Sequence, residues 1–295
     1  MDYGLQATLR GVASNFKRSG EAFAVKSLLF SLGFLALVAG EHRVGAQADY
    51  PLNGTAKISG GCSGSVFRFH GQPTDQNALV LTNGHCIQFP MLKPDEVLVN
   101  KPSFRFVRLF DADGSLTNWY PVKEIVYATM TGTDLAVLRL NMTYDELKND
   151  QNVDPFLMAD APGTIGEEII VVSGLWEYTT QCTYEALVDQ LHEGNWRFWD
   201  SIRYSEECET FGGTSGSPLL SVATGEIIGV NNTTFEGGTA CTVNNPCEVD
   251  EMGNATTIPD ASYAQQTIWL YECLTNDFDL DLDRDGCELP KPVAP

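Results

Sequence analysis

Short runs of strand-forming residues, separated by glycine, proline, asparagine and aspartate, recur along the chain from residue 65 onward. Each run supplies one strand and the residues between runs supply the turns, a pattern typical of antiparallel β structure. Long helical segments do not alternate with the runs, which argues against a parallel α/β sheet. The pattern predicts an all-β barrel or sandwich. The predicted strands are Ser65–His70, Ala78–Thr82, Phe104–Phe106, Val122–Tyr127, Leu135–Leu140, Ile169–Ser173, Cys182–Val188 and Ile227–Val230.

Two segments have helical features instead. Thr143-Tyr144-Asp145-Glu146 is a capping-box sequence that predicts the start of a short helix. Ser262 and Gln265 form a second capping box, and apolar and aromatic residues recur behind it at helical spacing. We therefore expect a C-terminal helix over 262–274, with its apolar stripe packed on the β domain.

Composition limits the class of partner and the cellular compartment. With 295 residues, 43% of them hydrophobic, the chain can bury a substantial core. A net charge of −21 disfavours nucleic acid as a partner, because phosphate binding needs a basic surface. The eight cysteines are even in number and form no CxxC pair, which favours disulfides in an oxidising compartment over a zinc site.

The N-terminal segment has the features of an export signal. Basic residues precede a mostly apolar run over Leu28–Ala39, which is shorter than the roughly 20 residues of a membrane-spanning helix. Small residues follow it, as at a signal-peptidase site. We interpret residues 1–46 as a signal peptide or, alternatively, an uncleaved anchor, and only the anchor would bring the chain to a membrane. The expected location is extracellular or periplasmic.

The last segment, over 275–295, is acidic. Asp281, Asp283 and Asp285 alternate before Gly286, as in the first half of a calcium-binding loop. Pro292 occupies the position at which such a loop would need its final carboxylate. These three aspartates are therefore weak calcium candidates, and a solvated acidic tail is the alternative.

A serine in a glycine-rich turn is the first candidate for chemistry. Ser215 lies in Gly212–Pro218, where flanking glycines permit a sharp turn with converging backbone N–H groups. A serine nucleophile needs a base, and His85 follows an apolar strand beside Cys86, whereas His70 and His192 lie in polar, turn-like surroundings. A plain surface loop and a structural histidine are the alternative interpretations.

A carboxylate must orient such a histidine, and Asp134 is the candidate. It leads directly into the apolar run Leu135–Leu140, where a charge without a partner would be costly. The alternative interpretation is an aspartate that only forms the turn before the strand.

Three sequence motifs, which occur in the chain order histidine, aspartate, serine, resemble those of the chymotrypsin-like serine peptidases. They are Leu-Thr-Asn-Gly-His85-Cys, Thr-Asp134-Leu-Ala-Val-Leu and Gly-Thr-Ser215-Gly-Ser-Pro, and the resemblance is strongest to the secreted bacterial, glutamyl-endopeptidase-like branch over about Gly60–Leu274. The resemblance implies a peptidase domain within 47–274: two six-stranded antiparallel Greek-key barrels, about 55–145 and 165–260, followed by the helix over 262–274.

The resemblance also implies roles for residues. His85 and Asp134 from the first barrel and Ser215 from the second would form a catalytic triad that works through an acyl-enzyme. The N–H groups of Gly213 and Ser215 would form an oxyanion hole. The expected substrate is a protein or peptide, with no cofactor required and a monomeric enzyme.

Two departures from the family pattern concern activation and specificity. Thr214 occupies the place of an aspartate that binds a newly freed N-terminus in zymogen-activated members, so that ion pair is not expected here. Asn231 replaces the pocket histidine of glutamate-specific members, while Thr210 and Gly212 match other pocket positions. Glu209, six residues before Ser215, would select a basic substrate residue unless the neighbouring cysteine turns it away from the pocket.

The cysteines are expected to pair in the order Cys62–Cys86, Cys182–Cys208, Cys241–Cys247 and Cys273–Cys287, although other pairings of the last six remain open. The leading hypothesis is a secreted serine endopeptidase. A catalytically silent binding module on the same fold is the alternative.

Overall fold

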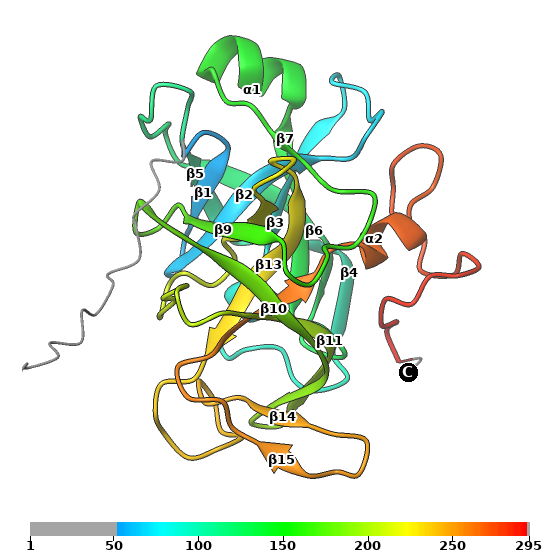
Figure 1. The fold of residues 1–295 in the computed structure, drawn as a ribbon. Helices are drawn as coiled ribbons and strands as arrows, with labels where there is room; N and C mark the ends of the chain where they lie inside the picture. The colour runs from blue at the N-terminus through cyan, green and yellow to red at the C-terminus, as the bar shows by residue number, and fades with distance from the viewer. Residues whose placement is uncertain (1–51, 294–295) are drawn as a thin grey trace, which may run out of the picture. The chain divides into compact units, whose positions relative to one another are not determined.

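Two antiparallel β-barrels make up the computed structural model, which describes residues 52–293 (Figure 1). The strands of the first sheet are β1 (Thr55–Ile58), β2 (Cys62–Arg68), β3 (Asn77–Thr82), β4 (Val97–Pro102), β5 (Phe106–Leu109), β6 (Tyr120–Thr129), β7 (Leu135–Thr143) and β8 (Phe156–Leu157). Six of them follow the order β1-β5-β6-β7-β3-β2, and pairing of β1 with β2 closes the ring. β4 pairs with β6 and β8 with β2 outside the ring.

The second sheet closes in the same way. Its strands are β9 (Glu168–Ser173), β10 (Tyr178–Glu193), β11 (Trp196–Tyr204), β12 (Pro218–Ser221), β13 (Ile227–Thr234), β14 (Cys247–Val249), β15 (Ala255–Thr256) and β16 (Ser262–Gln266). Six follow the order β11-β16-β13-β12-β9-β10, and the long β10–β11 hairpin completes the ring. β14 and β15, drawn in orange, extend this sheet from β10. The expected all-β architecture of two six-stranded barrels is confirmed.

Strand β7 is buried on both faces, which accounts for its uninterrupted apolar sequence. Ala136 and Leu138 contribute to one hydrophobic cluster of the core. Leu135 and Val137, which point to the opposite face, belong to a cluster that also contains Val230 of β13. The strand therefore links the core of the first barrel to side chains of the second, and Asp134 immediately precedes it.

The first predicted helix is confirmed. Helix α1 covers Tyr144–Gln151 and begins at Thr143, whose side chain accepts a hydrogen bond from the backbone N–H of Glu146. The Glu146 carboxylate in turn accepts from the backbone N–H of Thr143, which completes the capping box.

The C-terminal helix is much shorter than expected. α2 covers only Trp269–Glu272, whereas Ser262–Gln266 forms β16, so the prediction of a helix from residue 262 is wrong. The backbone of this segment pairs with β13 and β11, and all its residues are buried. Pairing on both sides outweighs the local capping signal, and the Ser262 hydroxyl donates to the Thr234 hydroxyl instead of capping a helix.

All four expected disulfides are present: Cys62–Cys86, Cys182–Cys208, Cys241–Cys247 and Cys273–Cys287. Four disulfides indicate an oxidising environment such as the extracellular space or periplasm. The last one fastens the acidic segment, whose Asp279 also forms an ion pair with Arg139 of β7 at 2.9 Å.

The calcium candidates Asp281, Asp283 and Asp285 are all exposed. Within residues 52–293 their carboxylates do not converge into a set of three possible ligands, and Asp283 pairs with Lys291 at 3.1 Å. Calcium binding here stays a prediction. The proposed signal or anchor over 1–46 lies outside the described residues, and among the helices of the described part none is long and apolar enough to cross a membrane.

Candidate active site

His85 lies on a short 3-10 turn over Gly84–Cys86 that directly follows β3. The turn sits against the end of β6, where any side chain at Gly84 would collide with the Thr129 carbonyl. Asn83 fastens the turn from the other side, because its side-chain amide donates to the backbone carbonyl of Asp134 at 2.8 Å. The glycine and the asparagine before the histidine therefore place it beside the start of β7.

His85 and Asp134 form a close pair. The Nδ1 atom of His85 lies 2.7 Å from Oδ2 of Asp134, and the backbone N–H of His85 donates to Oδ1 at 3.0 Å. Asp134 is 1% exposed, while the imidazole keeps 21% of its surface accessible. The carboxylate therefore fixes the ring from its buried side and holds a proton on Nδ1, which leaves Nε2 free to accept one.

Opposing influences set the pKa of His85. Burial lowers it, but the charge of Asp134, the hydrogen bond that His85 donates to that carboxylate and the charge of Glu193 together outweigh burial. The net result is a pKa above the ordinary value of 6.5. The imidazolium form is therefore stabilised, as a histidine that takes up a proton during a reaction requires.

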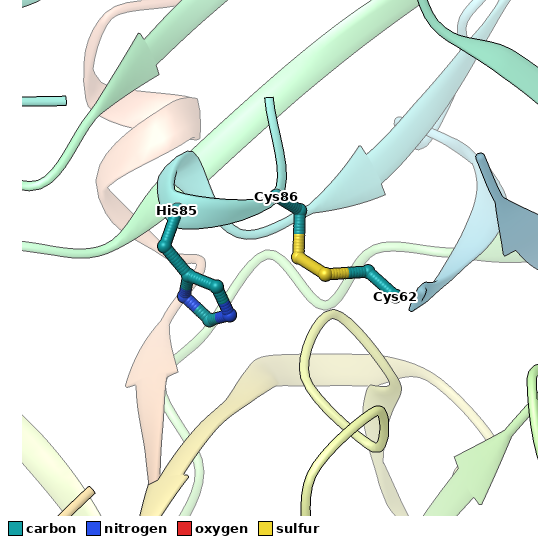
Figure 2. A group of neighbouring side chains, drawn as sticks. All are labelled: Cys62, His85 and Cys86. Atoms are coloured by element: carbon teal, nitrogen blue, oxygen red, sulfur yellow. A yellow bond between two sulfur atoms is a disulfide. The ribbon is translucent and has the colours of Figure 1, made fainter. Parts of the chain in front are cut away.

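Two consecutive residues of β2 connect this turn to the loop that carries Ser215. Cys62 is disulfide-bonded to Cys86, next to His85, as Figure 2 shows. The following residue, Ser63, donates its backbone N–H to the carbonyl of Ser215 at 2.8 Å. The Ser63 hydroxyl also donates to the carbonyl of Gly213 at 3.0 Å. The role of Ser63 was not predicted, since a serine within a strand gives no signal of such a role in the sequence.

The sulfur atoms beside His85 do not constitute a metal site. Within the part of the chain that the structure describes, Cys62, His85 and Cys86 are the only group of three possible ligands whose atoms lie within 4.8 Å of one another. Both sulfurs are consumed by the disulfide and cannot act as thiolate ligands.

The loop around Ser215 has the sharp turns expected from its glycines. Gly213 and Gly216 adopt φ values of +93° and +83°. A side chain at Gly216 would also collide with the Ser63 carbonyl. Among the described residues, neither the N–H of Gly213 nor that of Ser215 has a protein acceptor, so both remain available to an incoming oxygen. The Ser215 hydroxyl donates to the carbonyl of Asn232 at 3.2 Å.

Thr214 is the centre of a buried hydrogen-bond network. Its hydroxyl donates to the Phe211 carbonyl at 2.7 Å and accepts from the side-chain amide of Asn231 at 3.1 Å. The hydroxyl of Tyr204 donates to the other end of that amide at 3.2 Å. Neutral hydrogen bonds to β13 and β11 thus hold the loop. They involve Thr214, the residue at the position where zymogen-activated members have the aspartate that binds the N-terminus.

Replacing Thr214 with valine is expected to lower the free energy of unfolding by about 1–3 kcal/mol, measured by chemical denaturation with the disulfides intact. Valine keeps the shape of threonine but removes the acceptor of the Asn231 side-chain amide and of the Phe211 N–H. The Phe211 carbonyl keeps the bond from the Thr214 backbone N–H. Thr214→Ser retains the hydroxyl and is the matched control. Equal stability of the two variants would show that the hydroxyl does not hold the loop.

A single pocket brings these residues together. It encloses about 510 Å³ including its open mouth, and His85, Asp134 and Ser215 all line it. The predicted pocket residues Thr210, Gly212 and Asn231 line it as well, although the Asn231 amide is occupied by Thr214 and Tyr204.

Glu209 does not belong to this pocket. It is exposed and is not among the described residues that line this pocket, so selection of a basic substrate residue by Glu209 stays a prediction. Its neighbour Cys208 is buried and bonded to Cys182, which holds the chain with the Glu209 side chain turned outward. An acid that sequence analysis missed, Glu193, lines the pocket in its place.

Comparison with known proteins identifies the family. The family model described as a trypsin-like peptidase domain matches residues 62–230, which is more than half of the chain. The chain belongs to the trypsin-like peptidase family. The matched range of this trypsin-like domain includes His85, Asp134 and Ser215 but ends before β14 and the loop that precedes it. A search of curated protein sequences returns no match.

Solved structures related to this trypsin-like domain are distant in sequence. The apo MamO protease domain from Magnetospirillum magneticum is 15% identical with a TM-score of 0.48, and the match covers 76% of this chain and 97% of that one. Neuropsin, a serine protease expressed in the limbic system of mouse brain, is 13% identical with a TM-score of 0.43, covering 75% and 93%. The serine endoprotease from Yersinia pestis is 16% identical with a TM-score of 0.42, covering 76% and 62%.

Proposed function

We propose that this trypsin-like domain is a serine endopeptidase that hydrolyses peptide bonds in protein or peptide substrates through an acyl-enzyme. The observation that carries the proposal is the 2.7 Å bond between His85 and the buried Asp134, in the same pocket that Ser215 lines. A buried carboxylate that orients an accessible histidine beside a serine is the arrangement that nucleophilic catalysis needs.

In the proposed mechanism, the Ser215 hydroxyl turns from the Asn232 carbonyl towards Nε2 of His85. Ser215 Oγ attacks the scissile carbonyl while His85 takes the hydroxyl proton, and the charge of Asp134 stabilises the imidazolium. The free N–H groups of Gly213 and Ser215 bind the oxyanion. His85 then protonates the leaving amine, and a water activated by the same imidazole hydrolyses the acyl-enzyme.

The proposed site of action is outside the cytoplasm. The four disulfides support an oxidising compartment, and the cationic and apolar N-terminal sequence supports export.

The second candidate function is a binding module without activity. One observation favours it: the Ser215 hydroxyl donates to Asn232 and, among the described residues, has no hydrogen bond to His85. Incubating the disulfide-bonded protein with a complex peptide mixture, followed by mass spectrometry, distinguishes the two. An endopeptidase generates new internal termini, whereas a binding module leaves every peptide intact.

A further inference from the structure

Glu193 is a buried acid at the end of β10 that the proposed mechanism does not use. It is 8% exposed and lines the pocket with His85 and Ser215. One carboxylate oxygen accepts a hydrogen bond from the backbone N–H of Asn244 at 2.7 Å. Within residues 52–293, Glu193 forms no ion pair with a basic side chain of the protein.

The pocket around Glu193 is acidic. Glu236 lines it as well, and its carboxylate lies 3.5 Å from the side-chain amide of Asn244. Among the residues that the structure describes, no lysine or arginine lines the pocket, and the one basic group there, His85, is already paired with Asp134. Besides Asp134, two carboxylates thus line a pocket in which the described residues provide no lysine or arginine.

The position of Glu193 is built into the fold. The Cys241–Cys247 disulfide closes the loop that carries Asn244, a residue with a φ of +58°. The same loop is joined to the hairpin tip by a hydrogen bond from Gly194 N–H to the Cys241 carbonyl at 2.8 Å. The hairpin and the disulfide-closed loop therefore hold the carboxylate on the wall of the pocket.

We propose that Glu193 is a specificity-determining residue that selects substrates with a basic side chain, lysine or arginine, bound in this pocket. This inference rests on the proposed peptidase function. A buried carboxylate without a cationic partner is costly, and a substrate ammonium or guanidinium group would supply that partner. Burial raises the pKa of Glu193 and outweighs the opposing effects of the Asn244 hydrogen bond and the His85 charge. Glu236, at the exposed edge of the pocket, adds a second negative charge.

The experiment measures kcat/KM for matched peptides that differ only in whether lysine or the uncharged norleucine enters the pocket. The wild-type protein is expected to prefer the basic peptide, and in Glu193→Gln the preference should fall by at least about tenfold. Glutamine retains an oxygen for the Asn244 N–H but removes the charge. Glu209→Gln, which removes an exposed acid outside the pocket, is the matched control and should retain the preference.

The ratio of the two rates separates selectivity from folding, because a variant that folds poorly loses both rates together. Glu193→Asp, which keeps the charge, is expected to retain a preference for lysine. The proposal is overturned if the wild-type protein cleaves both peptides equally, or if Glu193→Gln keeps the wild-type ratio. Failure of the wild-type protein to cleave any peptide would instead overturn the proposed peptidase function.

Discussion

Replacement of Ser215 by alanine is expected to lower kcat for peptide hydrolysis by about 10⁶-fold. Alanine removes the only atom that attacks the substrate, while the backbone N–H groups of Gly213 and residue 215 remain. The loss should appear in kcat and not in KM, because the pocket walls are unchanged. Steady-state kinetics on a cleaved reporter peptide measures the effect.

The control for this variant is Ser115→Ala, an exposed serine outside the pocket. It should hydrolyse the reporter at the wild-type rate. Both variants should unfold at nearly the wild-type denaturant concentration, since Ser215→Ala loses only the hydrogen bond to Asn232. Persistence of the wild-type rate in Ser215→Ala would assign the activity to another residue or to a contaminant.

Replacement of Asp134 by asparagine is expected to lower kcat by about 10⁴-fold. The side chain keeps its size, but its amide can donate to Nδ1 of His85 and so favour the tautomer in which Nε2 carries the proton. That tautomer cannot accept the Ser215 proton, and the imidazolium loses its buried counter-charge.

The same variant is expected to change the pH dependence of kcat/KM. His85 must be neutral to act as a base, so activity is lost as the pH falls through its pKa, which in the wild-type protein lies above 6.5. Without the Asp134 charge, the effect of burial dominates and the pKa of His85 falls. The acid limb of the residual activity should therefore move to lower pH. An unchanged acid limb would show that Asp134 does not interact with the base.

Local sequence patterns carry much of the fold and of the site. The apolar run of β7 and the capping box of α1 depend on near neighbours in the chain, so they could be predicted from the sequence. His85 and Asp134 could be found because each borders an apolar strand, and Ser215 because glycines surround it. The helix predicted from Ser262 failed because β13 and β11, distant in the sequence, pair with that segment.

The position of Glu193 on the pocket wall and the support of the Ser215 loop depend on contacts between segments that are distant in the sequence. Glu193 lies in a polar stretch that resembles an exposed loop, and only pairing of β10 with β11 and the Asn244 contact bury it. Asn231 was predicted as a pocket residue from its position in the sequence. Its side-chain amide instead donates to Thr214 and accepts from Tyr204, which lies far away in the sequence.

Reaction of the disulfide-bonded protein with a fluorophosphonate, followed by peptide mapping, tests whether Ser215 is the nucleophile. We expect one covalent adduct, on Ser215, that requires His85 and is absent from Ser215→Ala. No adduct on correctly folded protein, or an adduct on a different serine, would contradict the assignment of Ser215 as the nucleophile.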